Sequence, residues 1–320
     1  MKVLSFGSLN IDYTYQVDHI VQRGETIHSG GLALHAGGKG LNQAIALAKA
    51  GADVYHAGSV GTDGGFLLEE LQAAGVHTEM QTAGVRTEMV RVLSDIRTGN
   101  AIIQNDSGGD NAIVLFGGAN QAIESSQIEE TVSRFVPGDF LVMQNEINRM
   151  PELMECAHAH GMKLVLNPAP MTQDVITFPL SFVDYLVVNE IEAGQLLEMS
   201  GDKKAASGSY RLPEDMEEMA QALQKAYPES AVILTCGAHG AVYADAGKCF
   251  LQASHPCRAV DTTAAGDTFI GYFTAEIMRG SSPETAMRTA AAASSITVTR
   301  AGAAASIPLL AEVRDCMKAE

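Results

Sequence analysis

The stretch Asp261-Thr-Thr-Ala-Ala-Gly-Asp267-Thr-Phe-Ile-Gly271 places two carboxylates around a run of small residues. Because this run opens directly into a helical pattern, it predicts a helix that starts with bare backbone amides beside an acid. Such amides form a ready binding site for phosphate. Phosphoryl transfer needs stabilised phosphate oxygens and an oriented hydroxyl, which amides and a carboxylate can supply. The alternative is an Asp that caps a helix after a turn of small residues.

Strands and helices alternate along the rest of the chain. Short apolar runs predict strands at residues 3–7, 54–60, 140–144, 163–167, 185–189 and 231–235. Helical patterns predict helices at residues 41–51, 64–74, 150–160, 192–199 and 215–226, and after Gly266. Alternation of this kind predicts an α/β fold with a doubly wound, mostly parallel sheet and helices on both faces. We expect residues 1–320 to form a single domain.

Two segments, residues 10–36 and about 77–117, alternate polar and apolar residues instead. They predict antiparallel strands in a small separate sheet, which would serve as a lid over the sheet edge where ligands bind. An exposed sheet face usually finds a partner, so we expect a homodimer through this lid. The polar residues 203–212 predict an exposed loop.

Composition excludes several classes of protein. The formal charge of −17 argues against a nucleic-acid binder, which needs a basic surface. The 5 cysteines are odd in number and lack a Cys-x-x-Cys spacing, which indicates reduced thiols in a cytoplasmic protein. The chain start does not resemble a signal peptide, and no apolar run is long enough to span a bilayer. We therefore expect neither a nucleic-acid partner nor a membrane partner.

A second glycine-rich stretch, Gly37-Gly-Lys-Gly-Leu-Asn42, precedes a predicted helix. Its glycines would let the backbone approach a ligand closely, while Lys39 and Asn42 reach toward it. It is not a nucleotide-binding P-loop, because Gly40 stands where Ser or Thr should hold magnesium. The alternative is a simple turn between a strand and a helix.

Polar residues follow three predicted strands. Asn10 and Asp12 lie past the first strand and offer the donors and acceptors that vicinal sugar hydroxyls need; the alternative is a strand-ending turn. Asn189 and Glu192 offer oxygens suited to a hydrated magnesium ion on a nucleotide, or else they cap a helix. The loop Thr235-Cys-Gly-Ala-His-Gly240 could hold phosphates through its amides, or it could be a tight turn.

Together these stretches resemble the PfkB carbohydrate kinase family, and within it the ribokinases. Residues 37–42 resemble the first signature of the family, and residues 261–271 resemble the highly specific second one. The resemblance covers nearly the whole chain and implies a ribokinase-like fold. Further matching pieces are Gly7–Asp12, Gly24–Thr26, Gly118–Asn120, Asn167–Pro170, Asn189–Glu192 and Val298–Gly302.

The resemblance implies a role for each matching residue. Asp267 would be the catalytic base, and the amides of Ala264, Ala265, Gly266 and Asp267 would form the anion hole. The positions that match sugar-binding residues are Asn10, Asp12, Gly38, Lys39, Asn42 and Glu146, with lid residues Ala101, Ile103 and Leu115. The positions that match ATP and Mg²⁺ sites are Asn189, Glu192, Thr235, Gly237, Gly240 and Gly266. The positions that match an activating K⁺ site are Asp261, Thr263, Thr297, Arg300, Gly302 and Ser306.

The implied activity is transfer of the γ-phosphate of ATP to the primary hydroxyl of a sugar, with D-ribose favoured by the apolar lid residues. A kinase of the same family for fructose, deoxyribose, a sugar acid or a nucleoside is the alternative, because residues 76–97 are longer than in typical ribokinases. A sugar-binding regulator without catalysis is a third reading. The presence of both Gly266 and Asp267 disfavours it.

Overall fold

The computed structural model describes residues 1–74, 86–106, 108 and 110–318, with the backbone alone for 86–88. The strands are β1 (Val3–Phe6), β2 (Asn10–Val17), β3 (Gly31–Gly37), β4 (Val54–Gly61), β5 (Arg86–Leu93), β6 (Gly99–Asp106), β7 (Asn111–Phe116), β8 (Phe140–Gln144), β9 (Lys163–Asn167), β10 (Tyr185–Asn189), β11 (Ala231–Thr235), β12 (Ala241–Ala244) and β13 (Cys249–Gln252). The α-helices are α1 (Lys39–Lys49), α2 (Gly65–Ala73), α3 (Ser125–Val132), α4 (Met150–Ala159), α5 (Glu190–Met199), α6 (Lys203–Ala206), α7 (Met216–Ala226), α8 (Ala265–Met278), α9 (Pro283–Thr297) and α10 (Leu310–Lys318). None of the helices in these ranges combines the length and apolar character that crossing a bilayer requires.

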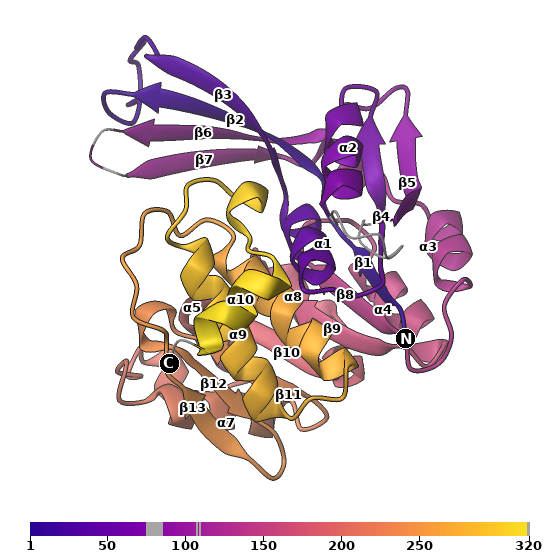
Figure 1. Cartoon of the computed structure of the whole chain (residues 1–320), viewed down its shortest axis with the longest axis vertical. Coiled ribbons are helices and arrows are strands. Elements are labelled where there is room, and N and C mark those ends of the chain that lie inside the picture. Colours follow the sequence, from indigo (N-terminus) through magenta and orange to yellow (C-terminus); the bar gives the residue numbers. More distant parts are fainter. Residues whose placement is uncertain (75–85, 107, 109, 319–320) are drawn as a thin grey trace.

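The large sheet has the strand order β13-β12-β11-β10-β9-β8-β1-β4-β5 (Figure 1). Its strands are parallel from β11 to β5, and β12 and β13 run antiparallel at the other edge. From β1 the chain adds β4 and β5 on one side, and later β8 to β11 on the other. The carboxyl ends of β1 and β8 therefore meet at the switch point of the sheet, where open α/β folds bind their ligands.

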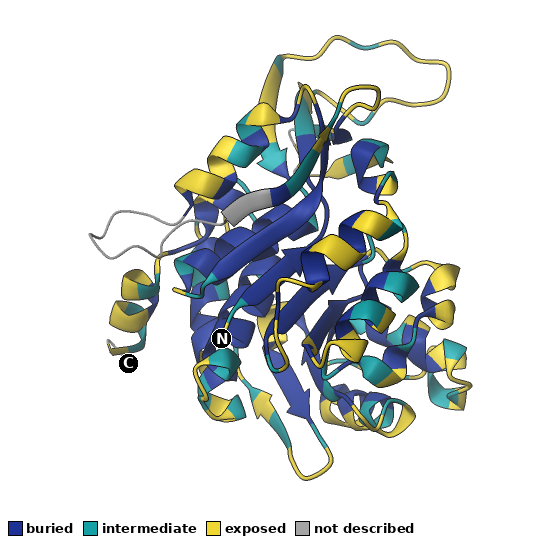
Figure 2. Cartoon of the chain, turned by 90° about the vertical axis from the view of Figure 1, so that its right-hand side faces the viewer, coloured by how far each residue is buried: buried dark blue, intermediate teal, exposed yellow. Residues whose placement is uncertain are grey.

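Successive strand residues point into two separate cores, one on each face of the large sheet. In β10, Val187 packs in the core that contains side chains of α1, α8 and α9. Its neighbours Leu186 and Val188 pack in the core that contains side chains of α3, α4, α5 and α7. Figure 2 shows these strands as buried ribbons between helices whose outer sides are exposed. Burial on both faces explains why the strands read as continuous apolar runs.

The small sheet has the order β3-β2-β6-β7 and projects from the body of the molecule (Figure 1). The prediction of purely antiparallel strands is wrong here, because β2 and β6 pair in parallel. These strands are separated in the chain by β3, α1, β4, α2 and β5, and such a long connection allows parallel pairing.

The extent predicted for the second segment of the small sheet is also wrong in part. Residues 86–93 form β5, which continues the large sheet beside β4. A strand that follows the helix after β4 pairs in parallel with β4, as in an ordinary βαβ unit. Residues 77–85 of that segment lie outside the described residues.

The predicted fold class is confirmed: a large, mostly parallel sheet is flanked by helices and accompanied by a smaller sheet. Residues 203–212 are not entirely a loop. They begin with the single turn of α6, whose first amides are capped by Asp202, with Ala205 N donating to Asp202 Oδ1 at 2.8 Å. A side chain that caps a turn satisfies amides that would otherwise be left open.

Helices α1 and α8 lie in contact because one residue between them has no side chain. A Cβ at Gly271 of α8 would lie 2.4 Å from Ala46 Cβ and 2.8 Å from Leu47 N, both in α1. Only glycine lets the two helices approach this closely.

We expect Gly271→Ala to destabilise the protein by about 1–3 kcal/mol, because the added methyl forces two packed helices apart. Gly194→Ala in α5 is the matched control, since its Cβ would meet only Met219 Cε at 3.8 Å. Higher helix propensity should make that control neutral or up to about 1 kcal/mol more stable. Urea unfolding of both variants measures the difference, and equal effects would contradict the close contact.

Candidate active site

The candidate site lies at the switch point, where side chains from both halves of the sheet meet. Ser8 follows β1 and its Oγ donates a hydrogen bond to Glu146 Oε2, just past β8. The backbone N–H of Lys39 donates to the same Glu146 oxygen at 3.1 Å. Glu146 therefore ties the end of β1 to the start of α1.

The start of α1 lies directly on the backbone that follows β1. A Cβ at Gly40 would lie 2.4 Å from Ser8 N and 2.5 Å from Gly7 C, so any larger residue is excluded. Gly38 has a φ of 95°, which glycine adopts without strain. This approach brings Lys39 and Asn42 to the carboxyl ends of the strands, as the glycine-rich stretch predicted.

Helix α8 begins at the site with an uncapped first turn. Ala264 has a φ of 61°, in the left-handed region that non-glycine residues rarely adopt, and its side chain forms no cap. Ala265 N donates to the carbonyl of Thr262 at 3.3 Å. Within the described part of the chain, the amides of Gly266 and Asp267 donate to no group. The strained left-handed backbone of Ala264 is characteristic of functional sites.

Asp267 is 8% exposed and is held by two residues of α1. Asn42 Nδ2 donates to Asp267 Oδ2 at 3.1 Å, and Gln43 Nε2 donates to Asp267 Oδ1 at 2.9 Å. The two glycine-rich stretches, far apart in the sequence, thus converge on one carboxylate.

A single lysine lies among the acids of the site. Burial lowers the pKa of Lys39, but the carboxylates of Asp267, Glu146 and Glu192 outweigh it and raise that pKa overall. Burial raises the pKa of Glu146, although Lys39 and the hydrogen bonds from Ser8 and Lys39 lower it in part. The Lys39 ammonium is therefore firmly charged, and it links three acids, one past the end of β8, one in α5 and one in α8.

Asp12 has a strongly perturbed carboxyl. Burial, helped by the charge of Glu146, raises its pKa from 3.8 to about 7. Its carboxylate lies over Gly37, where a Cβ would be 2.0 Å from Asp12 Oδ2. Its neighbour Asn10 is oriented by Asn120 Nδ2, which donates to Asn10 Oδ1 at 2.8 Å.

The three predicted lid residues share one face of the small sheet with Asp12. Cross-strand pairing places Asp12 opposite Ala101, and Ala101 opposite Leu115. Ile103 lies two residues further along β6 and so points to the same face. Ala101 is buried and Leu115 is 54% exposed, so apolar surface beside Asp12 stays open.

The predicted nucleotide residues lie at the ends of β10 and β11. Asn189 and Glu192 form a capping box at the start of α5: Asn189 Oδ1 accepts from Glu192 N at 2.8 Å, and Glu192 Oε2 accepts from Asn189 N at 3.0 Å. The capping interpretation is thus confirmed, while Glu192 still lies near enough to raise the pKa of Lys39. In the next loop, Gly237 and Gly240 have φ values of 51° and 101°.

The predicted potassium residues surround two loops joined by Asp261. Its Oδ1 accepts from Thr263 N at 2.9 Å and its Oδ2 accepts from Gly302 N at 2.9 Å. Thr297 Oγ1 donates to Thr268 Oγ1 at 3.1 Å, which links α9 to α8. The remaining side chains point elsewhere: Arg300 pairs with Glu312, and Ser306 Oγ donates to the Ala303 carbonyl at 2.7 Å.

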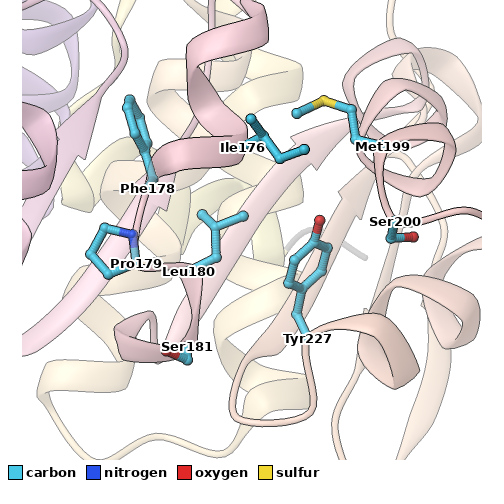
Figure 3. A pocket seen from close by; sticks show the side chains of 8 residues that line it. All are labelled: Ile176, Phe178, Pro179, Leu180, Ser181, Met199, Ser200 and Tyr227. Carbon is cyan, nitrogen blue, oxygen red and sulfur yellow. The ribbon is translucent and has the colours of Figure 1, made fainter.

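A hollow of about 390 Å³ lies away from this site (Figure 3). It is lined by Ile176, Phe178, Pro179, Leu180, Ser181, Met199, Ser200 and Tyr227. These residues lie at the amino ends of β10 and β11, the opposite end of the sheet from Asn189 and Thr235. Because its lining is largely apolar and holds no carboxylate or cation, the hollow offers no group for phosphoryl transfer.

Sequence reasoning gave no role to four residues that build the site: Ser8 and Asn120, which lie in stretches that match the family, and Gln43 and Gln144. Gln43 directly follows Asn42, so its position beside the glycine-rich stretch was the available signal. Gln144 ends β8 and its Nε2 donates to Gln43 Oε1 at 2.7 Å. A contact between two such distant residues cannot be read from spacing.

Comparison with known proteins agrees with this arrangement. The pfkB family carbohydrate kinase model matches residues 1–310. The ribokinase of Schizosaccharomyces pombe is 36% identical, with 98% of this chain and 96% of that protein covered. Among solved structures, the Cryptococcus neoformans ribokinase in complex with ADP is 33% identical with a TM-score of 0.83, covering 98% and 99% of the two chains. The Arabidopsis thaliana ribokinase complexed with ribose and ATP is 27% identical with a TM-score of 0.79, covering 99% and 98%. The chain belongs to the pfkB family of carbohydrate kinases.

Proposed function

We propose that this protein is an ATP-dependent ribose kinase, which transfers the γ-phosphate of ATP to the 5-hydroxyl of D-ribose. The observation that carries the proposal is the convergence of Asn42, Lys39 and the uncapped start of α8 on one nearly buried carboxylate. The likeness to ribokinases over almost the whole chain supports the choice of ribose.

In this proposal Asp267 takes the proton of the sugar's primary hydroxyl. A carboxylate is a weak base, but it suffices because the hydroxyl becomes acidic as it bonds to phosphorus, so the proton moves late. The open amides of Gly266 and Asp267, with that of Ala264, would stabilise the charge on the transferring phosphoryl group. The amide of Ala265 would have to give up its 3.3 Å bond to the Thr262 carbonyl to join them.

The sugar would lie between Asp12 and Asp267. Asn10 and Asp12 would accept and donate hydrogen bonds to its hydroxyls, together with Lys39, Asn42 and Glu146. The apolar residues Ala101, Ile103 and Leu115 would cover it, which makes the small sheet a lid that excludes water.

The nucleotide would lie over the ends of β10 and β11, near Asn189, Glu192 and the loop 235–240. Asn189 and Glu192 already cap α5 with one oxygen each, so they fit a water-mediated contact with Mg²⁺ better than a direct one. When bound with ATP, the Mg²⁺ ion would offset the negative charge of the phosphates.

The loops joined by Asp261 would hold K⁺. Both oxygens of Asp261 accept bonds from amides of the two loops, at Thr263 and Gly302, so the loops are held together whether or not an ion is present. Backbone carbonyls are the donors that remain for a large monovalent cation, close to the start of α8.

We expect purified protein to release ADP in the presence of Mg²⁺, ATP and ribose. Asp267→Asn should lower kcat by about 100-fold to 10,000-fold, because the base is lost while the shape is kept. Asp184→Asn is the matched control, since Asp184 pairs with Lys163 at the amino end of β10. Coupled ADP-release measurements on pentoses, hexoses and nucleosides would test the assignment.

Each arm of this experiment has a distinct meaning. Turnover on another sugar but not on ribose would contradict ribose as the substrate and leave the proposed phosphoryl-transfer mechanism intact. No turnover on any substrate despite measurable sugar binding would favour the regulator. Full activity after replacing K⁺ with tetramethylammonium would contradict the potassium site.

The raised pKa of Asp12 gives a second prediction. Ionised Asp12 would accept hydrogen bonds from two sugar hydroxyls, whereas its protonated form, which dominates below pH 7, would lose one acceptor. Affinity for ribose should therefore rise roughly tenfold between pH 6 and pH 8, following the ionised fraction. Asp12→Asn should bind more weakly and remove this part of the pH dependence. Calorimetric titration with ribose measures both, and an unchanged pH profile in the variant would exclude Asp12.

We also propose a homodimer through the outer face of the small sheet. Cross-strand pairing aligns Leu34, Tyr13, Ile102 and Val114 in one row across all four strands, on the face opposite Asp12. Leu34, Ile102 and Val114 are 54%, 43% and 64% exposed. A continuous apolar face of this kind marks an interaction surface.

Val114→Glu should convert the dimer to a monomer, because it places a charge at the edge-strand end of the apolar row, where the side chain is 64% exposed. Val136→Glu is the control, since Val136 is 61% exposed but lies outside the small sheet. Sedimentation velocity reports the oligomeric state, and a wild-type monomer would refute the proposal.

A cytoplasmic location completes the proposal. All five cysteines are unpaired in the structure. Thiols in this state suit a reducing compartment.

A further inference from the structure

We infer that Gln43 and Gln144 form a directed pair of amides that positions the Asp267 carboxylate for catalysis. The inference rests on the proposed kinase activity and adds two residues to it. Neither glutamine belongs to the substrate, nucleotide or cation positions described above.

The three side chains form one continuous chain of hydrogen bonds. Gln144 Nε2 donates to Gln43 Oε1 at 2.7 Å, and Gln43 Nε2 donates to Asp267 Oδ1 at 2.9 Å. Both glutamines are 0% exposed. The bonds are therefore shielded from competing water, which strengthens them.

The charge of Asp267 sets the direction of the whole chain. An ionised carboxylate only accepts hydrogen bonds, so the NH₂ group of Gln43 must face it. The Gln43 carbonyl then faces Gln144, which must in turn present its own NH₂ group. Each amide thus has a single orientation, fixed from the carboxylate outward.

The far end of the chain carries a cost that a purely structural role would not explain. Gln144 Oε1 is buried and accepts no hydrogen bond from any described residue. A buried acceptor without a partner destabilises a fold, typically by about 1–3 kcal/mol. A Cβ on residue 7 would lie only 2.2 Å from Gln144 Oε1, so glycine at position 7 makes room for this oxygen. An unfavourable group kept in a well-packed core points to a functional requirement.

The arrangement fixes the plane of the carboxylate. Asn42 holds Oδ2 and Gln43 holds Oδ1, so both oxygens are attached to α1. Gln144 prevents the Gln43 amide from turning over, although it does not touch Asp267. Both glutamines are therefore positioning residues: they keep the base aimed at the site where the sugar hydroxyl arrives, and they contact no substrate.

The test compares isosteric variants at three buried glutamines. Gln43→Met keeps the size but removes the donor, and should lower kcat by about 10-fold to 100-fold. Gln43→Glu should lower it further, because two carboxylates would face each other. Gln144→Met should lower kcat by less than about tenfold, since Asp267 still orients Gln43. KM for sugar and for ATP should stay within about twofold of wild type in all three.

Gln127→Met is the matched control. Gln127 is also buried and its Nε2 donates to the Gly58 carbonyl at 2.6 Å, but it lies on α3 on the other face of the sheet. It should lose stability with kcat unchanged. If Gln43→Met behaves like Gln127→Met, or raises KM for the sugar at constant kcat, the inference is overturned.

A second measurement separates this inference from the proposed function. In urea unfolding, Gln43→Met and Asp267→Ala should be non-additive, because each removes the same hydrogen bond. Additive effects would show that the contact is absent and would overturn the inference even in an active enzyme. A wild-type protein without turnover on any sugar would overturn the proposed function, while non-additivity would still establish the hydrogen bond between Gln43 and Asp267.

Discussion

Helix α1 packs closely against two other segments, the end of β1 and helix α8, because a glycine lies at each contact, and the candidate site depends on this packing. A Cβ at Gly40 would lie 2.4 Å from Ser8 N, and one at Gly271 would lie 2.4 Å from Ala46 Cβ. The helix is thus fixed both to the end of β1 and to α8. Lys39, Asn42 and Gln43 are adjacent on this helix, so fixing one end of α1 places all three around Asp267. Close packing converts a short glycine-rich stretch into a rigid reference for the catalytic geometry.

The packing of α1 against β1 and α8 also determines which charged groups lie together in the site. Three carboxyl groups, from Glu146, Glu192 and Asp267, lie near one lysine, and a fourth, from Asp12, lies near Glu146, in a chain whose formal charge is −17. Anionic phosphates can approach such a site only where positive potential comes from backbone amides, Lys39 or bound cations. This explains why α8 starts with open amides instead of a side-chain cap, and why the strained φ of 61° at Ala264 is retained. A conventional Asp or Ser cap would close the one location suited to phosphate.

Much of this arrangement follows from sequence, and the limits have physical causes. The alternation of strands and helices predicts the sheet, and the two glycine-rich stretches predict that Asn42 and Asp267 matter. Spacing does not say which sheet an alternating strand joins, so β5 was assigned to the small sheet although it pairs with β4. Nor does it reveal Gln144, whose bond to Gln43 spans 101 positions and depends on how α1 lies across β8. At Asn189 and Glu192 the capping alternative is confirmed, and the nucleotide role stays a prediction.

The small sheet shows how one register determines two surfaces. Asp12, Ala101 and Leu115 form one row across it, and Tyr13, Ile102 and Val114 form the next row on the opposite face. A slip of one residue would exchange the two rows, moving Asp12 to the outer face of the small sheet and turning the apolar row toward the candidate site. The parallel pairing of β2 with β6 opposes such a slip, because β2 leads directly out of β1 and its first residue, Asn10, is held by Asn120. The same bond that orients a predicted sugar ligand therefore keeps the cover of the site, and its outer face, in register.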